Sequence, residues 1–137
     1  MNADSGLRFT VEHLGLAARD AVALRDWYIR VVGAELVFDN REQPPAFLLR
    51  MPGGPLLEIY PAHTSLPDTA NNRLAGWRHV ALQVLSLEAA RDVLIARGVV
   101  FTEQIKPAGG GGRVLFFPDG EGNLLHLVER PAGVNYR

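Results

Sequence analysis

An internal repeat constrains the fold of this chain more than any other feature of its sequence. Three landmarks recur in the two halves: a histidine in the first predicted strand, a polar helix cap and a glycine that ends the helix. They are His13 and His79, Asp20 and Ser86, and Gly33 and Gly98, separated by 66, 66 and 65 residues. Because all three recur in nearly the same register, the chain is predicted to contain two equivalent modules.

Each half is predicted to form a strand, a helix and three further strands. In the first half these cover residues 9–18, 21–32, 35–38, 46–50 and 56–60. In the second half they cover residues 78–84, a helix after the Ser86 cap, and residues 99–102, 113–117 and 124–129. The sequence therefore predicts an α+β fold of two βαβββ modules, in which curved mixed sheets form a cleft. One domain spans residues 1–137, with modules at 7–60 and 77–130 and a linker at 61–76 rich in Pro, Asn, Thr and Ser.

Composition excludes several classes of function. The chain has 137 residues, a net charge of −1 and no cysteine. Without clustered Lys and Arg it does not read as a nucleic-acid binder, and it has no apolar run of the roughly 18 residues that span a membrane. We therefore expect a cytoplasmic protein that has neither nucleic acid nor a membrane as its partner. A chain of this size also builds an adequate core without crosslinks, so a bound metal would serve function.

Four side chains with metal-binding chemistry fall at corresponding positions of the two halves. His13 and His79 lie on the first strand of each half, and Glu58 and His126 lie on the last. The carboxylate of Glu58 has apolar neighbours and is costly to bury unless it is paired or bound to a metal. Three imidazoles and one carboxylate suit one divalent ion per site, such as zinc, nickel, cobalt, iron or manganese.

Other interpretations of these residues remain open. A single histidine in a strand is more often a hydrogen-bonded core or rim residue than a metal ligand. Glu58 has Arg50 and Arg113 as alternative partners. Arg50, Arg78 and Arg113 are candidates to contact an acidic substrate, and the alternative is that they are solvated charges at the rim.

Several motifs together resemble the vicinal oxygen chelate superfamily. They are HLGL at 13–16, WY at 27–28, VGAEL at 32–36, LE at 57–58, RHVAL at 78–82 and GNLLHLVE at 122–129. That superfamily contains glyoxalase I, methylmalonyl-CoA epimerase, extradiol dioxygenases, fosfomycin-resistance enzymes and bleomycin-binding proteins. The resemblance implies a glyoxalase-like fold with a metal in a U-shaped cleft, commonly completed in a homodimer.

Matched by position, His13 and His79 correspond to the superfamily's metal ligands on the first strand of each module. Glu58 corresponds to the glutamate on the last strand of the first module. His126 stands where bacterial glyoxalase I usually has glutamate. The resemblance thus implies the ligand set His13, Glu58, His79 and His126.

The function expected from this set is a metal-dependent lyase or isomerase. It would act on a small substrate with neighbouring oxygens through a metal-stabilised enolate, with Glu58 as the candidate base and His126 as the alternative base. Two other functions stay open. One is an extradiol-type ferrous dioxygenase, and the other is a metal-free protein that binds small molecules or sequesters an antibiotic.

Overall fold

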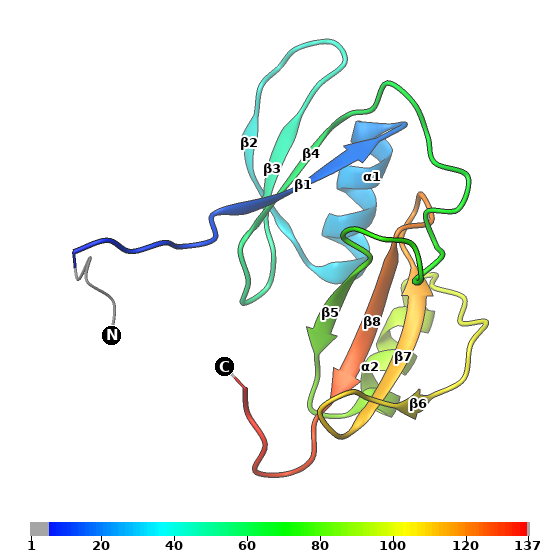
Figure 1. The fold of residues 1–137 in the computed structure, drawn as a ribbon. Helices are drawn as coiled ribbons and strands as arrows, with labels where there is room; N and C mark the ends of the chain where they lie inside the picture. The colour runs from blue at the N-terminus through cyan, green and yellow to red at the C-terminus, as the bar shows by residue number, and fades with distance from the viewer. Residues whose placement is uncertain (1–5, 137) are drawn as a thin grey trace.

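The two halves of the chain repeat one arrangement of elements in the computed structural model, which describes residues 6–136 (Figure 1). The first half contains β1 (His13–Ala18), α1 (Ala21–Trp27), the π-helical turn η1 (Tyr28–Val32), β2 (Glu35–Asp39), β3 (Phe47–Arg50) and β4 (Leu56–Pro61). The second contains β5 (His79–Gln83), α2 (Leu87–Ala96), β6 (Lys106–Pro107), β7 (Arg113–Pro118) and β8 (Leu124–Glu129). This arrangement confirms the predicted α+β fold of two βαβββ modules.

Local sequence signals set the ends of both helices. The Asp20 carboxylate accepts a hydrogen bond from the backbone N–H of Ala23, and the Ser86 hydroxyl accepts one from the N–H of Ala89. Both predicted N-caps are therefore confirmed. Gly33 ends η1 at a φ of 84°, in the left-handed region that favours glycine.

Each module forms its own four-stranded mixed sheet. The strand orders are β1-β4-β3-β2 and β5-β8-β7-β6, and in each sheet the first and last strands of the module pair in parallel. The registers correspond: Gly15 lies opposite Glu58 on β1 and β4, and Ala81 lies opposite His126 on β5 and β8. The repeat seen in the sequence is thus a repeat of strand pairing, and it places the two pairs of candidate ligands at equivalent positions.

The strand predicted at residues 99–102 is wrong, because this segment lies outside both sheets. Val99 is buried and Val100 is exposed, so the alternation expected of a strand is present. The edge beside β7 is instead taken by the short β6, with Lys106 opposite Val114. An alternating pattern of apolar residues indicates which side chains are buried, whereas a β-strand also needs a neighbouring strand to which its backbone is hydrogen-bonded.

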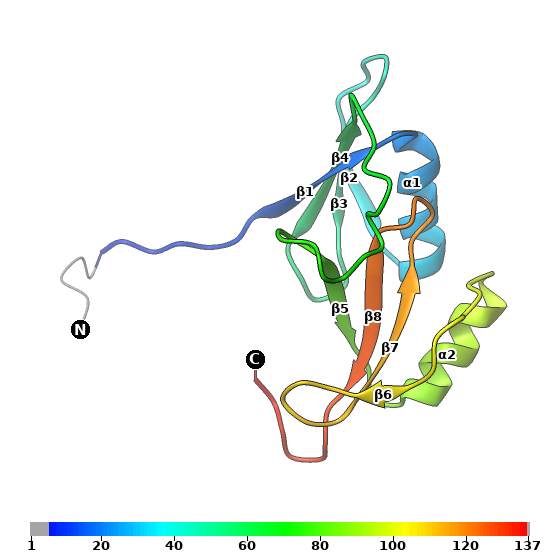
Figure 2. The ribbon, with the colours of Figure 1, turned by 45° about the vertical axis from the view of Figure 1, so that its right-hand side comes forward.

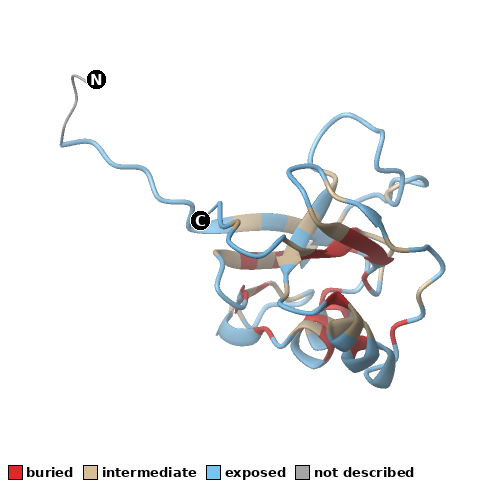
Figure 3. Ribbon diagram, turned by 90° about the horizontal axis from the view of Figure 1, so that it is seen from below, coloured by how far each residue is buried: buried red, intermediate tan, exposed pale blue. Residues whose placement is uncertain are grey.

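The first strand also begins later than the predicted residue 9. Residues 6–12 are exposed and project from the body of the molecule (Figures 1 and 3). The backbone N–H of Leu56 donates to the carbonyl of Glu12, and β4 begins at that residue. The segment before Glu12 therefore has no neighbouring strand residue to pair with.

One apolar core joins the two modules. Buried residues from both belong to a single cluster, among them Leu24 and Val31 of the first module and Leu87 and Leu125 of the second. Polar contacts reinforce the joint: the Tyr28 hydroxyl donates to the Asp119 carboxylate over 2.7 Å. The burial of apolar side chains has no preferred direction, whereas a hydrogen bond does. The Tyr28–Asp119 hydrogen bond therefore helps to fix how the two modules are oriented relative to each other.

Both helices lie on the same side of the two sheets, so no helix covers the other faces (Figure 2). On β1 and β5 the residues that alternate with the half-buried Leu14, Leu16, Val80 and Leu82 are exposed, as the predicted alternation requires. His13 and His79 belong to this exposed set. No helix in the described part of the chain is both long enough and apolar enough to cross a membrane.

Candidate functional site

The four predicted ligands form two pairs, one in each module. In the first pair, Nε2 of His13 lies 3.8 Å from Oε1 of Glu58. In the second pair, the rings of His79 and His126 have their centroids 4.8 Å apart. Each pair joins the first strand of its module to the last, because those strands are neighbours in the sheet.

The first pair is open to solvent. The side chains of His13 and Glu58 are each 41% exposed. The Glu58 carboxylate makes no hydrogen bond with any residue from 6 to 136, and the ionisable side chain beside it is His13. At 3.8 Å the two atoms are too far apart for a hydrogen bond, whereas two ligands of one zinc ion lie about 3–3.5 Å apart. A small approach would let both atoms contact the same cation.

The second pair is packed against an aromatic ring. His126 is 7% exposed, and the Phe116 ring lies 4.7 Å from the His126 ring and 5.5 Å from the His79 ring, measured between centroids. Phe116 is directly opposite His126 on the neighbouring strand β7. Burial lowers the pKa of His126, and positive charge on His79, Arg130 and Lys106 lowers it further, against the opposing effect of the Leu127 carbonyl. This imidazole therefore favours its neutral form, which is the form that binds a metal.

The three histidines of the two pairs share one hydrogen-bonding arrangement. Nδ1 of His13 lies 2.9 Å from the Glu12 carboxylate, and Nδ1 of His79 lies 2.8 Å from the side-chain oxygen of Asn72. Nδ1 of His126 lies 3.2 Å from the backbone carbonyl of Leu127. These oxygens only accept hydrogen bonds, so each Nδ1 carries the proton and donates it.

In the neutral form of these rings, Nε2 then holds a free lone pair. An oxygen acceptor on one ring nitrogen, with the other nitrogen left for a metal, is the usual arrangement of metal-binding histidines. His13, His79 and His126 therefore have the right tautomer for metal ligands. The donor set of three imidazoles and one carboxylate fits a divalent first-row ion.

The two pairs do not form one cluster within a single chain. Among residues 6–136, no three His, Asp or Glu side chains gather closely enough to hold a metal ion. The convergence of His13, Glu58, His79 and His126 on one ion stays a prediction. What the structure brings together is His13 with Glu58, and His79 with His126.

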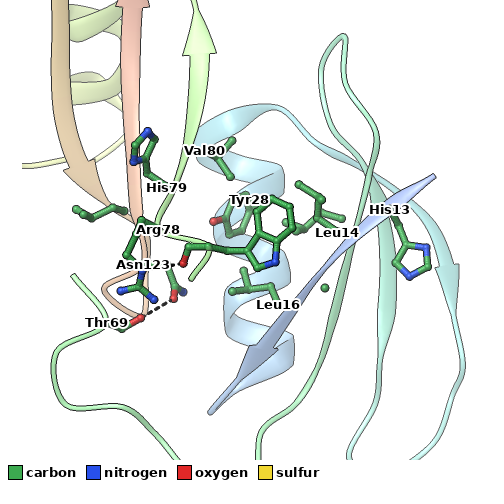
Figure 4. Close-up of a pocket in the computed structure, with 13 residues that line it drawn as sticks. His13, Leu14, Leu16, Tyr28, Thr69, Arg78, His79, Val80 and Asn123 are labelled. Carbon is green, nitrogen blue, oxygen red and sulfur yellow. Dashed lines mark hydrogen bonds between the residues drawn. The ribbon is translucent and has the colours of Figure 1, made fainter. Parts of the chain in front are cut away.

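A cavity of about 300 Å³ lies between the two modules and is lined by His13 and His79 (Figure 4). Its walls are mainly apolar and include Leu14, Leu16, Leu57, Val80 and Leu124. Polar side chains gather at one end, where the Thr69 hydroxyl lies 3.2 Å from the side-chain oxygen of Asn123. An apolar space with a few convergent polar groups is the usual form of a site for a small molecule.

Several residues at the site had no signal in the sequence analysis. Asn72 belongs to the linker, seven positions from the histidine that it orients, and nothing in its surroundings marks it. Trp77, beside the cavity, is 91% exposed. Phe116 was found only as one apolar residue of a strand, although pairing of the last two strands would have placed it opposite His126.

Two of the three candidate arginines are paired with carboxylates other than Glu58. Arg50 donates to Glu35 over 3.2 Å. Arg113 contacts Glu88 and Glu129, and these contacts raise the pKa of its guanidinium. The alternative in which Glu58 pairs with Arg50 or Arg113 is therefore not seen.

Comparison with known proteins supports the fold and the family. The family model described as "Glyoxalase/Bleomycin resistance protein/Dioxygenase superfamily" matches residues 10–127. No curated protein gives a significant match to the sequence.

Many solved structures share the fold. A glyoxylase/bleomycin resistance protein/dioxygenase domain from Frankia sp. EAN1pec is 21% identical, with 93% of this chain and 96% of that chain covered and a TM-score of 0.70. A superfamily member from Sphaerobacter thermophilus DSM 20745 is 25% identical, with 90% and 98% covered and a TM-score of 0.66. TnmS3, described as an antibiotic binding protein from Streptomyces sp. CB03234, is 20% identical, with 90% and 98% covered and a TM-score of 0.69.

The family match includes both modules and extends over most of the chain, and the repeated βαβββ architecture agrees with it. The chain belongs to the glyoxalase/bleomycin resistance protein/dioxygenase superfamily.

Proposed function

We propose that this protein is a metal-dependent lyase or isomerase that acts on a small substrate with two neighbouring oxygens. The observation that carries the proposal is a contact shared by His13, His79 and His126, in which Nδ1 lies within hydrogen-bond distance of an oxygen and Nε2 makes no hydrogen bond to the described residues. Three histidines with the same Nδ1 contact, on the first or last strands of the repeated modules, have a common explanation in metal binding.

The metal would be held by His13, Glu58, His79 and His126. When bound, a divalent ion supplies positive charge that polarises a carbonyl group and stabilises the enolate left by removal of a neighbouring proton. Zinc, nickel, cobalt, iron and manganese all suit this donor set.

Glu58 is the better candidate for the base. Its carboxylate is partly exposed and makes no hydrogen bond with the described residues, so it is free to move towards a substrate proton. His126 is buried and fixed by the Leu127 carbonyl and the Phe116 ring. A fixed, buried imidazole suits a permanent ligand better than a group that must transfer a proton.

A second copy of the chain would complete the site. Each chain carries two pairs, and each pair lies at an open edge, because β1 and β5 are both edge strands of their sheets. In a symmetric homodimer, the first pair of one protomer would face the second pair of its partner, which gives two equivalent four-ligand sites.

Subunit mixing tests this arrangement. The His13→Ala and His79→Ala variants are unfolded together, refolded and assayed for bound zinc. If each site combines two protomers, a mixed dimer keeps one intact site, and random mixing restores about a quarter of the wild-type zinc. If both pairs come from one chain, mixing restores none. A monomer by light scattering would also contradict the proposal.

The Glu58→Gln variant tests the role of the base. The amide keeps the shape of the side chain but does not accept a proton, so we expect turnover to fall about 10²–10⁴-fold while metal remains bound. The assay is an anaerobic panel of α-keto aldehydes, thioesters and catechols with zinc- or nickel-loaded protein. Turnover only with ferrous iron and oxygen would indicate the extradiol-type dioxygenase instead.

A metal-free binding function is a second candidate, supported by the largely apolar cavity and by the fold shared with TnmS3. It predicts that protein treated with a chelator still binds an apolar ligand and that His79→Ala leaves this binding unchanged. Zinc binding with matching loss in His79→Ala would count against it.

A further inference from the structure

The cavity has a charged end that the proposed chemistry does not use. Arg78 lies next to His79 and lines the cavity, close to Thr69 and Asn123 (Figure 4). No aspartate or glutamate is among the described residues that line this space.

The guanidinium of Arg78 is fixed in place but not neutralised. Its Nε donates to the carbonyl of Trp77 over 2.9 Å, and its Nη1 donates to the carbonyl of Asn71 over 3.2 Å. Within residues 6–136 it forms no ion pair, whereas Arg50 and Arg113 are paired with carboxylates. Of the three arginines that the sequence offered for an acidic substrate, Arg78 alone keeps an unpaired charge and faces the cavity.

The remaining walls of the cavity indicate the chemistry of the uncharged part of the ligand. Leu14 and Leu16 lie across the space from Arg78, and the exposed indole of Trp77 borders the space. A volume of about 300 Å³ is at the small end of ligand sites. An apolar wall accepts hydrocarbon, and an indole ring stacks on flat aromatic groups.

The geometry points to a substrate that is a small carboxylic acid with an aromatic or branched apolar body, anchored by its carboxylate on Arg78. This inference rests on the proposed function, because it names the substrate class of that same site. A fixed guanidinium with unused N–H groups binds a carboxylate through charge-assisted hydrogen bonds. Arg78 would thereby orient the substrate beside His79 without taking part in proton transfer.

The test compares two probes of nearly the same shape, 3-phenylpropanoate and its neutral amide, 3-phenylpropanamide. Binding is measured by calorimetry and by the NMR shift of the Trp77 indole in protein treated with EDTA. We expect the acid to bind about tenfold more tightly than the amide. Arg78→Gln should remove this preference, and Arg50→Gln, which changes an exposed arginine paired with Glu35, should keep it.

Three results would overturn the inference: equal binding of acid and amide, a preference that survives in Arg78→Gln, or no saturable binding of either probe up to about 10 mM. The comparison in the wild-type protein holds even if Arg78→Gln fails to fold. Because the assay contains no metal, its failure is distinct from a failure to bind zinc, which would overturn the proposed function instead.

Discussion

The two candidate ligand pairs occupy the same register in the two sheets but lie in different surroundings. His13 and Glu58 are both partly exposed, and His13 is held by an exposed carboxylate, Glu12. His79 and His126 pack against Phe116, and His126 is almost fully buried. The repeat fixes where the functional side chains are, while their neighbours decide how rigid and how polar each pair is.

This difference favours a division of roles. The His79 and His126 rings are held by hydrogen bonds and by packing against Phe116, and burial favours the neutral form of His126, which suits metal retention. An exposed pair with a carboxylate that lacks hydrogen bonds can change position when a substrate arrives. The second module would therefore hold the ion, and the first would provide the group that moves.

Removing His79 should have the largest effect. We expect His79→Ala to weaken zinc binding by more than about 100-fold, beyond the range typical of residues that only orient a ligand. The fold should persist because His79 is exposed. Calorimetry with zinc and far-UV circular dichroism measure the two quantities.

His63→Ala is the matched control for this variant, since His63 is an exposed histidine between the two modules. It should bind zinc like the wild type. Stoichiometric zinc in His79→Ala would show that the second pair does not hold the ion.

The residues that orient the two histidines should matter unequally. Asn72→Ala removes the acceptor for Nδ1 of His79, and we expect about a tenfold loss of zinc affinity. Glu12→Gln keeps an oxygen acceptor beside His13 and loses only a charge that is 76% exposed, so its effect should be smaller.

Asn72→Asp provides a rescue, because its carboxylate still accepts the hydrogen bond from His79. Zinc titration of the three variants under one condition ranks them. Wild-type affinity in Asn72→Ala, or a larger loss in Glu12→Gln, would contradict the contrast between the pairs.

The third prediction concerns stability at low pH, where the burial of His126 should have the smallest of the three effects. Because the folded state lowers the pKa of His126, the unfolded chain takes up a proton first as the pH falls below about 6.5. The stability associated with neutral His126 is therefore present above that pH and is lost below it.

The His126→Leu variant should lose less stability between pH 7 and pH 5 than the wild type in urea unfolding without metal. His63→Leu controls for the loss of a histidine that is exposed. Equal losses in all three proteins would show that His126 does not distinguish the folded from the unfolded state.

Local signals in the sequence were sufficient for most of the fold. The caps at Asp20 and Ser86 and the stop at Gly33 act within a few residues, so they can be recognised without knowing what packs nearby. Residues 99–102 failed because their alternation of buried and exposed side chains occurs without a neighbouring strand. Strand pairing is a contact between distant segments, which a local pattern does not record.

The residues of the candidate site also fall into those that the sequence identified and those that only the structure showed. The repeat alone identified His13, Glu58, His79 and His126 as equivalent positions, because strand periodicity and module register follow from the order of residues. Contacts of Asn72 with His79 and of Phe116 with His126, together with the unpaired charge of Arg78, came from the tertiary structure. Such contacts depend on which distant segments pack together. Packing follows from burying apolar side chains of the whole chain in one dense core, so no single segment of the sequence determines it.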